Sequence, residues 1–186
     1  MSTEPEVIVT ADDLGISPGA NHAIREAHRN GCLTHASLLA NGDFRQDAVD
    51  TVIRGCPRLA VGAHLNLTYG LALTDFPGMG ADGAFSLGFA GILRKSLQGD
   101  GPFLAAVERE LRAQLEWIQG QRVALAHLDG HQHVHMIPGI DSVVTRLARE
   151  HAVSRIRIPD ESFPLSLWVG RSPSFLRNGG LVRYLL

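Results

Sequence analysis

The chain has 186 residues, 45% of them hydrophobic, which is typical of one globular domain covering residues 1–186. Its formal net charge of −2 gives no basic surface for nucleic acid or an anionic membrane, so we expect a small-molecule partner. No apolar run reaches the roughly 20 residues of a membrane span, and the N-terminal MSTEPEVIVTADD lacks the features of a secretory signal, so we expect a cytoplasmic protein.

Strand-forming and helix-forming segments alternate along the chain. In chain order we expect a strand at 7–12, a helix at 18–30, a strand within 34–42, a helix at 43–55 and a strand at 59–67. Residues 68–101 are rich in glycine and are predicted to form a long loop. A helix at 102–119, a strand at 123–129, a helix at 140–152 and a strand at 154–159 follow. This alternation predicts an α/β fold with a parallel sheet.

Acidic and histidine residues gather where three of these strands end. Asp12 and Asp13 end the first strand, His64 lies near the end of the third, and Asp129 and His131 end the fourth. Each has a structural alternative, as a turn or helix cap for the aspartates and as a core or surface histidine for the imidazoles. Because the carboxyl ends of parallel strands meet at one edge, where active sites are built, a shared site is favoured.

Two imidazoles and a carboxylate suit a divalent metal with positions left open to water. Zinc, iron, manganese, cobalt and nickel fit such a set, and magnesium fits it less naturally. A second carboxylate beside a ligand can act as general base. Asp12 and Asp13 can divide these tasks only if the backbone turns after the strand, as Gly15 and Ser17 indicate, because consecutive strand side chains point to opposite faces.

The segment HLDGHQHVH, residues 127–135, places histidine or aspartate at every second position. On an extended backbone these side chains would share one face, but Gly130 is expected to end that regularity. We therefore expect His131 to be a ligand and Asp129 to be the acceptor that orients it. His133 and His135 are expected to line the pocket.

Three motifs resemble those of a known family. TADDLGISPGANHAI, GAHLNLT and HLDGHQHVHMIP are similar to the motifs of the YdjC-like (ChbG) carbohydrate deacetylase family, which includes hopanoid-biosynthesis-associated deacetylases. The resemblance implies a distorted (β/α) barrel related to polysaccharide deacetylases, and metal-dependent removal of acetyl groups from N-acetylated sugars. It also implies that Asp13, His64 and His131 hold the metal and that Asp12 is the catalytic base. Arg157 matches the family's Arg-x-Pro segment.

The chain departs from that family after this segment. Family members continue into further strands and a late histidine motif, whereas this sequence ends at Leu186. Five strands do not close a barrel, so we expect an incomplete barrel, with a shortened chain or a homodimer as explanations. The acid that protonates the departing amine is then His133, His135 or a group in the missing segment.

These observations lead to one hypothesis and two alternatives. The hypothesis is a hydrolase that uses one divalent ion (Zn, Mg, Mn, Co, Ni or Fe) to deacetylate an N-acetylated sugar or sugar conjugate. The first alternative is a metallophosphoesterase, although no second ligand set or basic phosphate pocket is evident. The second is a catalytically silent family member that binds sugar or metal, or regulates a partner.

Overall fold

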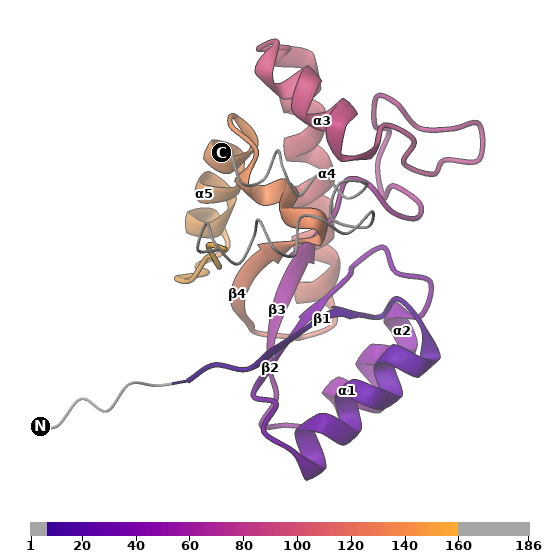
Figure 1. Ribbon diagram of the computed structural model, residues 1–186, viewed down its shortest axis with the longest axis vertical. Helices are drawn as coiled ribbons and strands as arrows, with labels where there is room; N and C mark the ends of the chain where they lie inside the picture. Colours follow the sequence, from indigo (N-terminus) through magenta and orange to yellow (C-terminus); the bar gives the residue numbers. More distant parts are fainter. Residues whose placement is uncertain (1–6, 160–186) are drawn as a thin grey trace, which may run out of the picture.

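A parallel sheet with helices packed around it forms the part of the chain that the computed structural model describes, residues 7–159 (Figure 1). The strands are β1 (Thr10–Leu14), β2 (His35–Leu38), β3 (Ala60–Leu65) and β4 (Leu125–Gly130). The helices are α1 (Pro18–Asn30), α2 (Arg45–Asp47), α3 (Gly88–Leu97), α4 (Gly101–Gly120) and α5 (Ile140–Glu150). A π-helical segment, η1 (Ala48–Ile53), continues α2, and a 3-10 segment, η2 (His131–Met136), follows β4.

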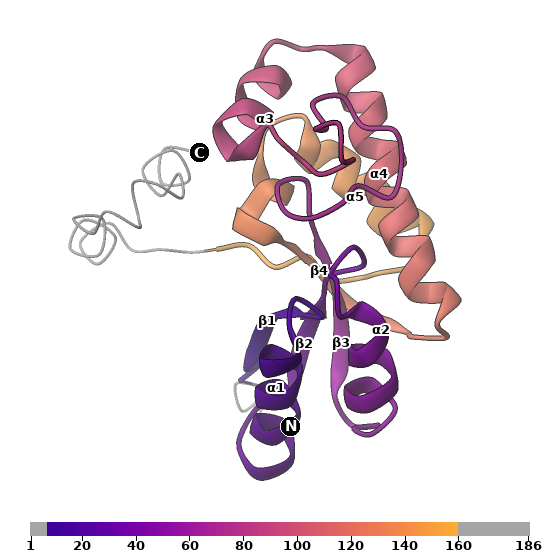
Figure 2. The ribbon, with the colours of Figure 1, turned by 90° about the vertical axis from the view of Figure 1, so that its right-hand side faces the viewer.

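The strand order explains the architecture. The four strands lie in the order β1-β2-β3-β4, and every neighbouring pair is parallel. Each crossover therefore moves the chain one strand further in the same direction, as in a (β/α) barrel and unlike a doubly wound sheet. Within residues 7–159 the sheet is open, so the predicted α/β fold with an incomplete barrel is confirmed. Figure 2 shows α1 and α2 beside the early strands, with α3, α4 and α5 gathered at the other end of the molecule.

Helix α1 begins and ends where the sequence predicts. The Ser17 side chain accepts a hydrogen bond from the Ala20 backbone N–H (3.1 Å), and Pro18 occupies the first turn, where its missing donor has no cost. The buried Asn21 then accepts from the Gly15 N–H (2.8 Å). Helix α1 thereby holds the loop that follows β1, directly after the predicted acidic pair at the end of that strand.

Helix α4 closes the other side of the core. The Asp100 side chain caps it by accepting from the Phe103 N–H (3.1 Å), and its apolar face buries Leu111, Leu115 and Ile118. The same helix buries two polar residues that face the loop after β3, described below. The hydrophobic core therefore includes side chains from the sheet, from α4 and from α5.

Three predicted elements differ from the structure. Residues 68–101 are not all loop, because α3 covers Gly88–Leu97 and buries Phe89 and Ile92. Strand β1 begins at Thr10, since Val7 and Ile8 lie exposed before it. The predicted fifth strand is reduced to one parallel bridge between Ile156 and Leu128.

Two further expectations concern the chain as a whole. None of the helices within residues 7–159 is both long enough and apolar enough to cross a membrane. The predicted single domain over residues 1–186 extends past the described residues at both ends, and it stays a prediction.

Candidate metal centre

The backbone turns within β1 itself, at the acidic pair. Asp13 has a φ of 62°, in the left-handed region, and the pairing of β1 with β2 shifts register between Ala11 and Leu14. That conformation costs an ordinary residue about 1 kcal/mol, and aspartate tolerates it better than most. Because of this turn, the side chains of Asp12 and Asp13 can both serve the carboxyl edge of the sheet, as the sequence required.

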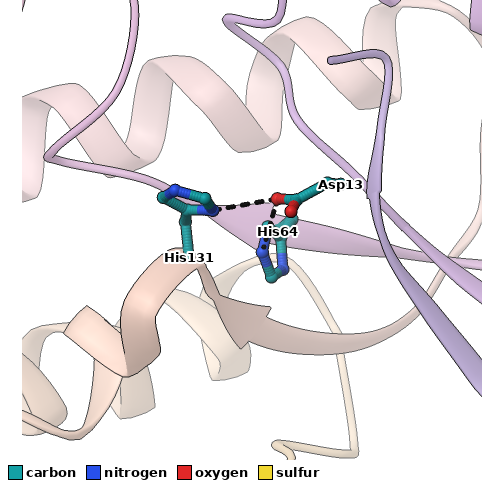
Figure 3. Close-up of side chains that lie close together, drawn as sticks. All are labelled: Asp13, His64 and His131. Carbon is teal, nitrogen blue, oxygen red and sulfur yellow. Dashed lines mark hydrogen bonds and ion pairs between the residues drawn. The ribbon is translucent and has the colours of Figure 1, made fainter. Parts of the chain in front are cut away.

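Asp13, His64 and His131 converge at this edge from three separate segments (Figure 3). Oδ1 of Asp13 lies 3.2 Å from Nε2 of His64 and 2.9 Å from Nδ1 of His131. The carboxylate comes from β1, the first imidazole from β3 and the second from the start of η2. His64 is buried, while Asp13 and His131 are half-buried, so the cluster is partly open to solvent.

A buried carboxylate orients His64. Nδ1 of His64 donates to Oδ1 of Asp129 (2.7 Å), and the other oxygen of Asp129 accepts from the Ser37 hydroxyl (2.7 Å). Because Asp129 holds the Nδ1 proton, Nε2 is directed toward Asp13 and is free to act as a ligand. The sequence predicted that Asp129 orients His131. In the structure Asp129 binds His64 instead.

The carboxylates favour a positive charge at this position. Burial alone lowers the pKa of His64, but hydrogen bonds to Asp129 and Asp13 outweigh it and raise that pKa to about 9. Burial likewise raises the pKa of Asp13, yet its contacts with His131 and His64 hold it well below its usual range. A divalent cation between the same side chains would supply that positive charge directly.

The donor set fits a divalent metal ion. Ligand atoms about 2.1 Å from a tetrahedral ion lie about 3.4 Å apart, close to the two contacts measured to the Asp13 carboxylate. Two imidazoles and one carboxylate suit zinc and its first-row neighbours, and leave coordination positions for water or substrate. Asp13, His64 and His131 are therefore the residues of the described chain that best suit an ion.

A second group, Asp12, His64 and Asp129, also brings ligand atoms together. Its members are engaged elsewhere, since Asp129 binds His64 and Ser37 and Asp12 binds Arg157. The group centred on Asp13 is thus the better candidate.

Arg157 connects Asp12 with Asp129. Its Nη1 donates to Oδ1 of Asp12 (2.7 Å) and lies 3.4 Å from Oδ2 of Asp129. The backbone oxygen of Arg157 contacts Nε2 of the buried His135 (2.8 Å). His135 thus holds the segment that carries Arg157, and Arg157 holds the exposed Asp12 beside the cluster.

The extended conformation of the histidine-rich segment, residues 127–135, ends at Gly130, as the sequence predicted. Strand β4 ends at Gly130, and η2 begins with His131. Gln132 and His133 then adopt left-handed conformations, with φ of 53° and 58°. His133 is half-buried, whereas His135 is buried. Burial lowers the pKa of His135. The regular alternation across the nine residues is therefore lost after Gly130.

A cavity of about 480 Å³ opens beside this site rather than over it. Its lining includes Thr10, His35, His127 and Arg157, but none of the three clustered residues. Nδ1 of His127 is buried there without a hydrogen-bond partner among the described residues. The cavity is therefore distinct from the cluster of Asp13, His64 and His131.

Sequence reasoning did not single out Ser37 or Tyr69. Ser37 lies mid-strand with only the pattern of β2 around it, so nothing in the sequence marks its hydroxyl as the partner of Asp129. Tyr69 follows GAHLNLT directly, and its ring centroid lies 6.0 Å from that of His131. An aromatic residue directly after the motif that carries His64 is the signal that could have identified it.

Two comparisons with known proteins show what the chain as a whole is similar to. The model of a family described as YdjC-like protein matches residues 6–181. A crystal structure of a protein from Enterococcus faecalis V583, named for cellobiose-phosphate cleavage, is similar with a TM-score of 0.69 and 24% sequence identity. The match covers 88% of this chain and 62% of that one, so the present chain spans less than two thirds of its neighbour.

Proposed function

The chain belongs to the YdjC-like family, and we propose that it is a metal-dependent hydrolase that removes the acetyl group from an N-acetylated sugar or sugar conjugate. The observation that carries the proposal is the convergence of Asp13, His64 and His131 at the carboxyl edge of the sheet. Asp12 lies next to this cluster with its carboxylate held by Arg157. A set of metal ligands, and a carboxylate outside that set that can act as general base, are the two parts that metal-dependent hydrolysis of an amide requires.

The cluster would hold one divalent ion. Such an ion polarises a carbonyl oxygen and lowers the pKa of water, so that hydroxide forms near neutral pH. His64 contributes Nε2 in a fixed direction because Asp129 holds its opposite nitrogen. Asp13 and His131 complete the set, and their partial exposure leaves room for an acetamide to approach.

Asp12 is the proposed general base. Its carboxylate is exposed, and Arg157 fixes one oxygen, which leaves the other to accept a proton from the attacking water. The negative charge that develops on the acetamide oxygen falls beside the cluster, where a positive charge is favoured. Collapse then breaks the C–N bond and yields acetate and a sugar amine.

The amine must gain a proton as it leaves. His135 is unsuited to deliver it, because the ring is buried and its Nε2 contacts the backbone oxygen of Arg157. His133 is half-buried and lies two residues after His131, so it is the better candidate for the acid among these two. A His133→Gln variant that loses kcat but keeps its metal would support this assignment.

Acetate release tests the proposal. The protein is loaded separately with Zn, Mg, Mn, Co, Ni and Fe and incubated with N-acetylated mono- and oligosaccharides, in parallel with phosphate monoesters. We expect acetate and free amine in equal amounts with at least one ion, and no product in His64→Ala. Phosphate release without acetate would instead identify a metallophosphoesterase. An ion bound without any turnover would indicate a silent, binding member of the family.

A further inference from the structure

Tyr69 stands beside the candidate centre on the loop that follows β3. Its ring centroid lies 6.0 Å from that of His131, with 52° between the ring planes. The residue is 36% exposed, so the ring is in contact with the site and still open to solvent. An exposed aromatic ring held next to a reactive centre is suited to bind an apolar face of a ligand.

Two buried asparagines fix the backbone of Tyr69. Oδ1 of Asn66 accepts from the Tyr69 N–H (3.1 Å), and Nδ2 of Asn66 donates to the Tyr69 carbonyl (2.7 Å). Nδ2 of Asn41 donates to the same carbonyl (2.9 Å). Asn41 follows β2 and Asn66 follows β3, so the loop is attached to two strand ends that border the site.

Two buried side chains of helix α4, Gln114 and Glu110, hold the loop that carries Tyr69. Gln114 accepts from the Asn66 N–H (3.0 Å) and donates to the Asn66 carbonyl (2.7 Å). Gln114 also donates to the carboxyl group of Glu110 (2.8 Å), which accepts from the Thr74 N–H (2.8 Å). All three side chains that form this chain of hydrogen bonds, Asn66, Glu110 and Gln114, are buried.

Such a network has a clear physical consequence. Buried polar groups are costly unless satisfied, and a satisfied network permits one arrangement rather than many. The loop from residue 66 to residue 74 is therefore ordered before any ligand arrives. A ligand that packs on Tyr69 does not have to order this loop, which improves its affinity.

We propose that Tyr69 is the stacking platform for the sugar ring of the substrate. This inference rests on the proposed function, and it adds where the sugar binds. A pyranose has one face made mainly of C–H groups, which packs on an aromatic ring, while its acetamide can extend toward the neighbouring His131. The site would thereby prefer substrates in which the N-acetyl group is carried by a pyranose over small open-chain acetamides.

Three variants test the platform on the metal-loaded protein. For acetate release from a dimer of N-acetylglucosamine, Tyr69→Ala should raise KM about tenfold and leave kcat within about twofold. Tyr69→Phe keeps the ring face and should match the wild type. Leu71→Ala removes an exposed apolar side chain from the same loop and should also match it. Metal content should be equal in all four proteins.

Several results would overturn the inference while the proposed function stands. These are an unchanged KM in Tyr69→Ala, an equal loss in Tyr69→Phe, which would assign the effect to the hydroxyl, and loss of metal from Tyr69→Ala, which would make the residue structural. If the wild type releases no acetate, the proposed function fails first. Binding of the same sugar, followed by NMR, then decides the platform: weaker binding by Tyr69→Ala supports it, and equal or undetectable binding to both proteins contradicts it.

Discussion

Asp13 combines an unfavourable backbone conformation with the contacts that define the site. Its left-handed φ places its carboxylate against both imidazoles of the cluster, whereas a regular strand would direct Asp12 and Asp13 to opposite faces. Strained residues of this kind are found where function requires a side chain in one place. The conformation and the convergence of ligands thus point to the same residue.

The division of labour between the two aspartates gives the first prediction. Asp12→Asn keeps the size of the side chain and removes its ability to accept a proton, so turnover should fall at least about 100-fold. The ion should remain, because Asp12 is outside the cluster of Asp13, His64 and His131. Acetate release and elemental analysis on the same sample measure both. Loss of the ion together with activity would place Asp12 among the ligands.

The orienting role of Asp129 gives the second. In Asp129→Asn the amide oxygen is a weaker acceptor for Nδ1 of His64, so metal affinity should fall about 10- to 100-fold. Competition with a fluorescent chelator measures the affinity. Gln46→Ala, a change on an exposed side chain of α2, serves as the control and should bind as the wild type does. Equal affinities in all three proteins would remove Asp129 from the site.

Elements differ in how far the sequence predicts them. Helix α1 has a capping serine, a proline in its first turn and a terminal glycine, and its predicted bounds are those observed. Helix α3 was missed because no side chain caps it and glycines surround it, although its buried Phe89 and Ile92 keep helical spacing. The segment around Ile156 has the composition of a strand, but pairing depends on a neighbour that composition does not reveal.

The candidate site, too, could be predicted only in part from the sequence. The convergence of Asp13, His64 and His131 was predictable because strand ends in a parallel sheet share an edge. Their pairing was not, since the choice of Asp129 for His64 rather than His131 depends on where β4 ends and η2 turns. The hydrogen bond from Ser37 to Asp129 joins side chains 92 positions apart, and no local pattern indicates it.

The close approach of β3 to β4 gives a prediction about the stability of the sheet. A Cβ atom at Gly62 would lie 2.4 Å from the His127 ring, which cannot move without losing its contact with Ser37 (2.9 Å). Gly62→Ala should therefore lower the free energy of unfolding by about 1–3 kcal/mol. Gly120→Ala, at the end of α4 with open space around it, should not lower it. Urea denaturation compares them, and equal stability would contradict the packing of His127.

For the whole molecule, an ion at the carboxyl edge would tie together β1, β3 and η2, three segments that are distant in sequence. An ion present at about 100 times its Kd stabilises the folded state by about 2.7 kcal/mol, equivalent to a rise in Tm of about 5–10 °C for a chain of this size. Thermal unfolding with and without the ion measures this rise, and a chelator should reverse it. A similar rise in His64→Ala would show that the ion acts elsewhere.

The most direct test of the account is the metal content of the protein after incubation with each of the six ions. Elemental analysis should find about one ion per chain in the wild type and in His133→Ala, and none in His131→Ala. The two variants remove the same ring from the same short segment, so only the position of the histidine differs. Equal metal in both variants, or none in the wild type, would contradict a metal centre at Asp13, His64 and His131.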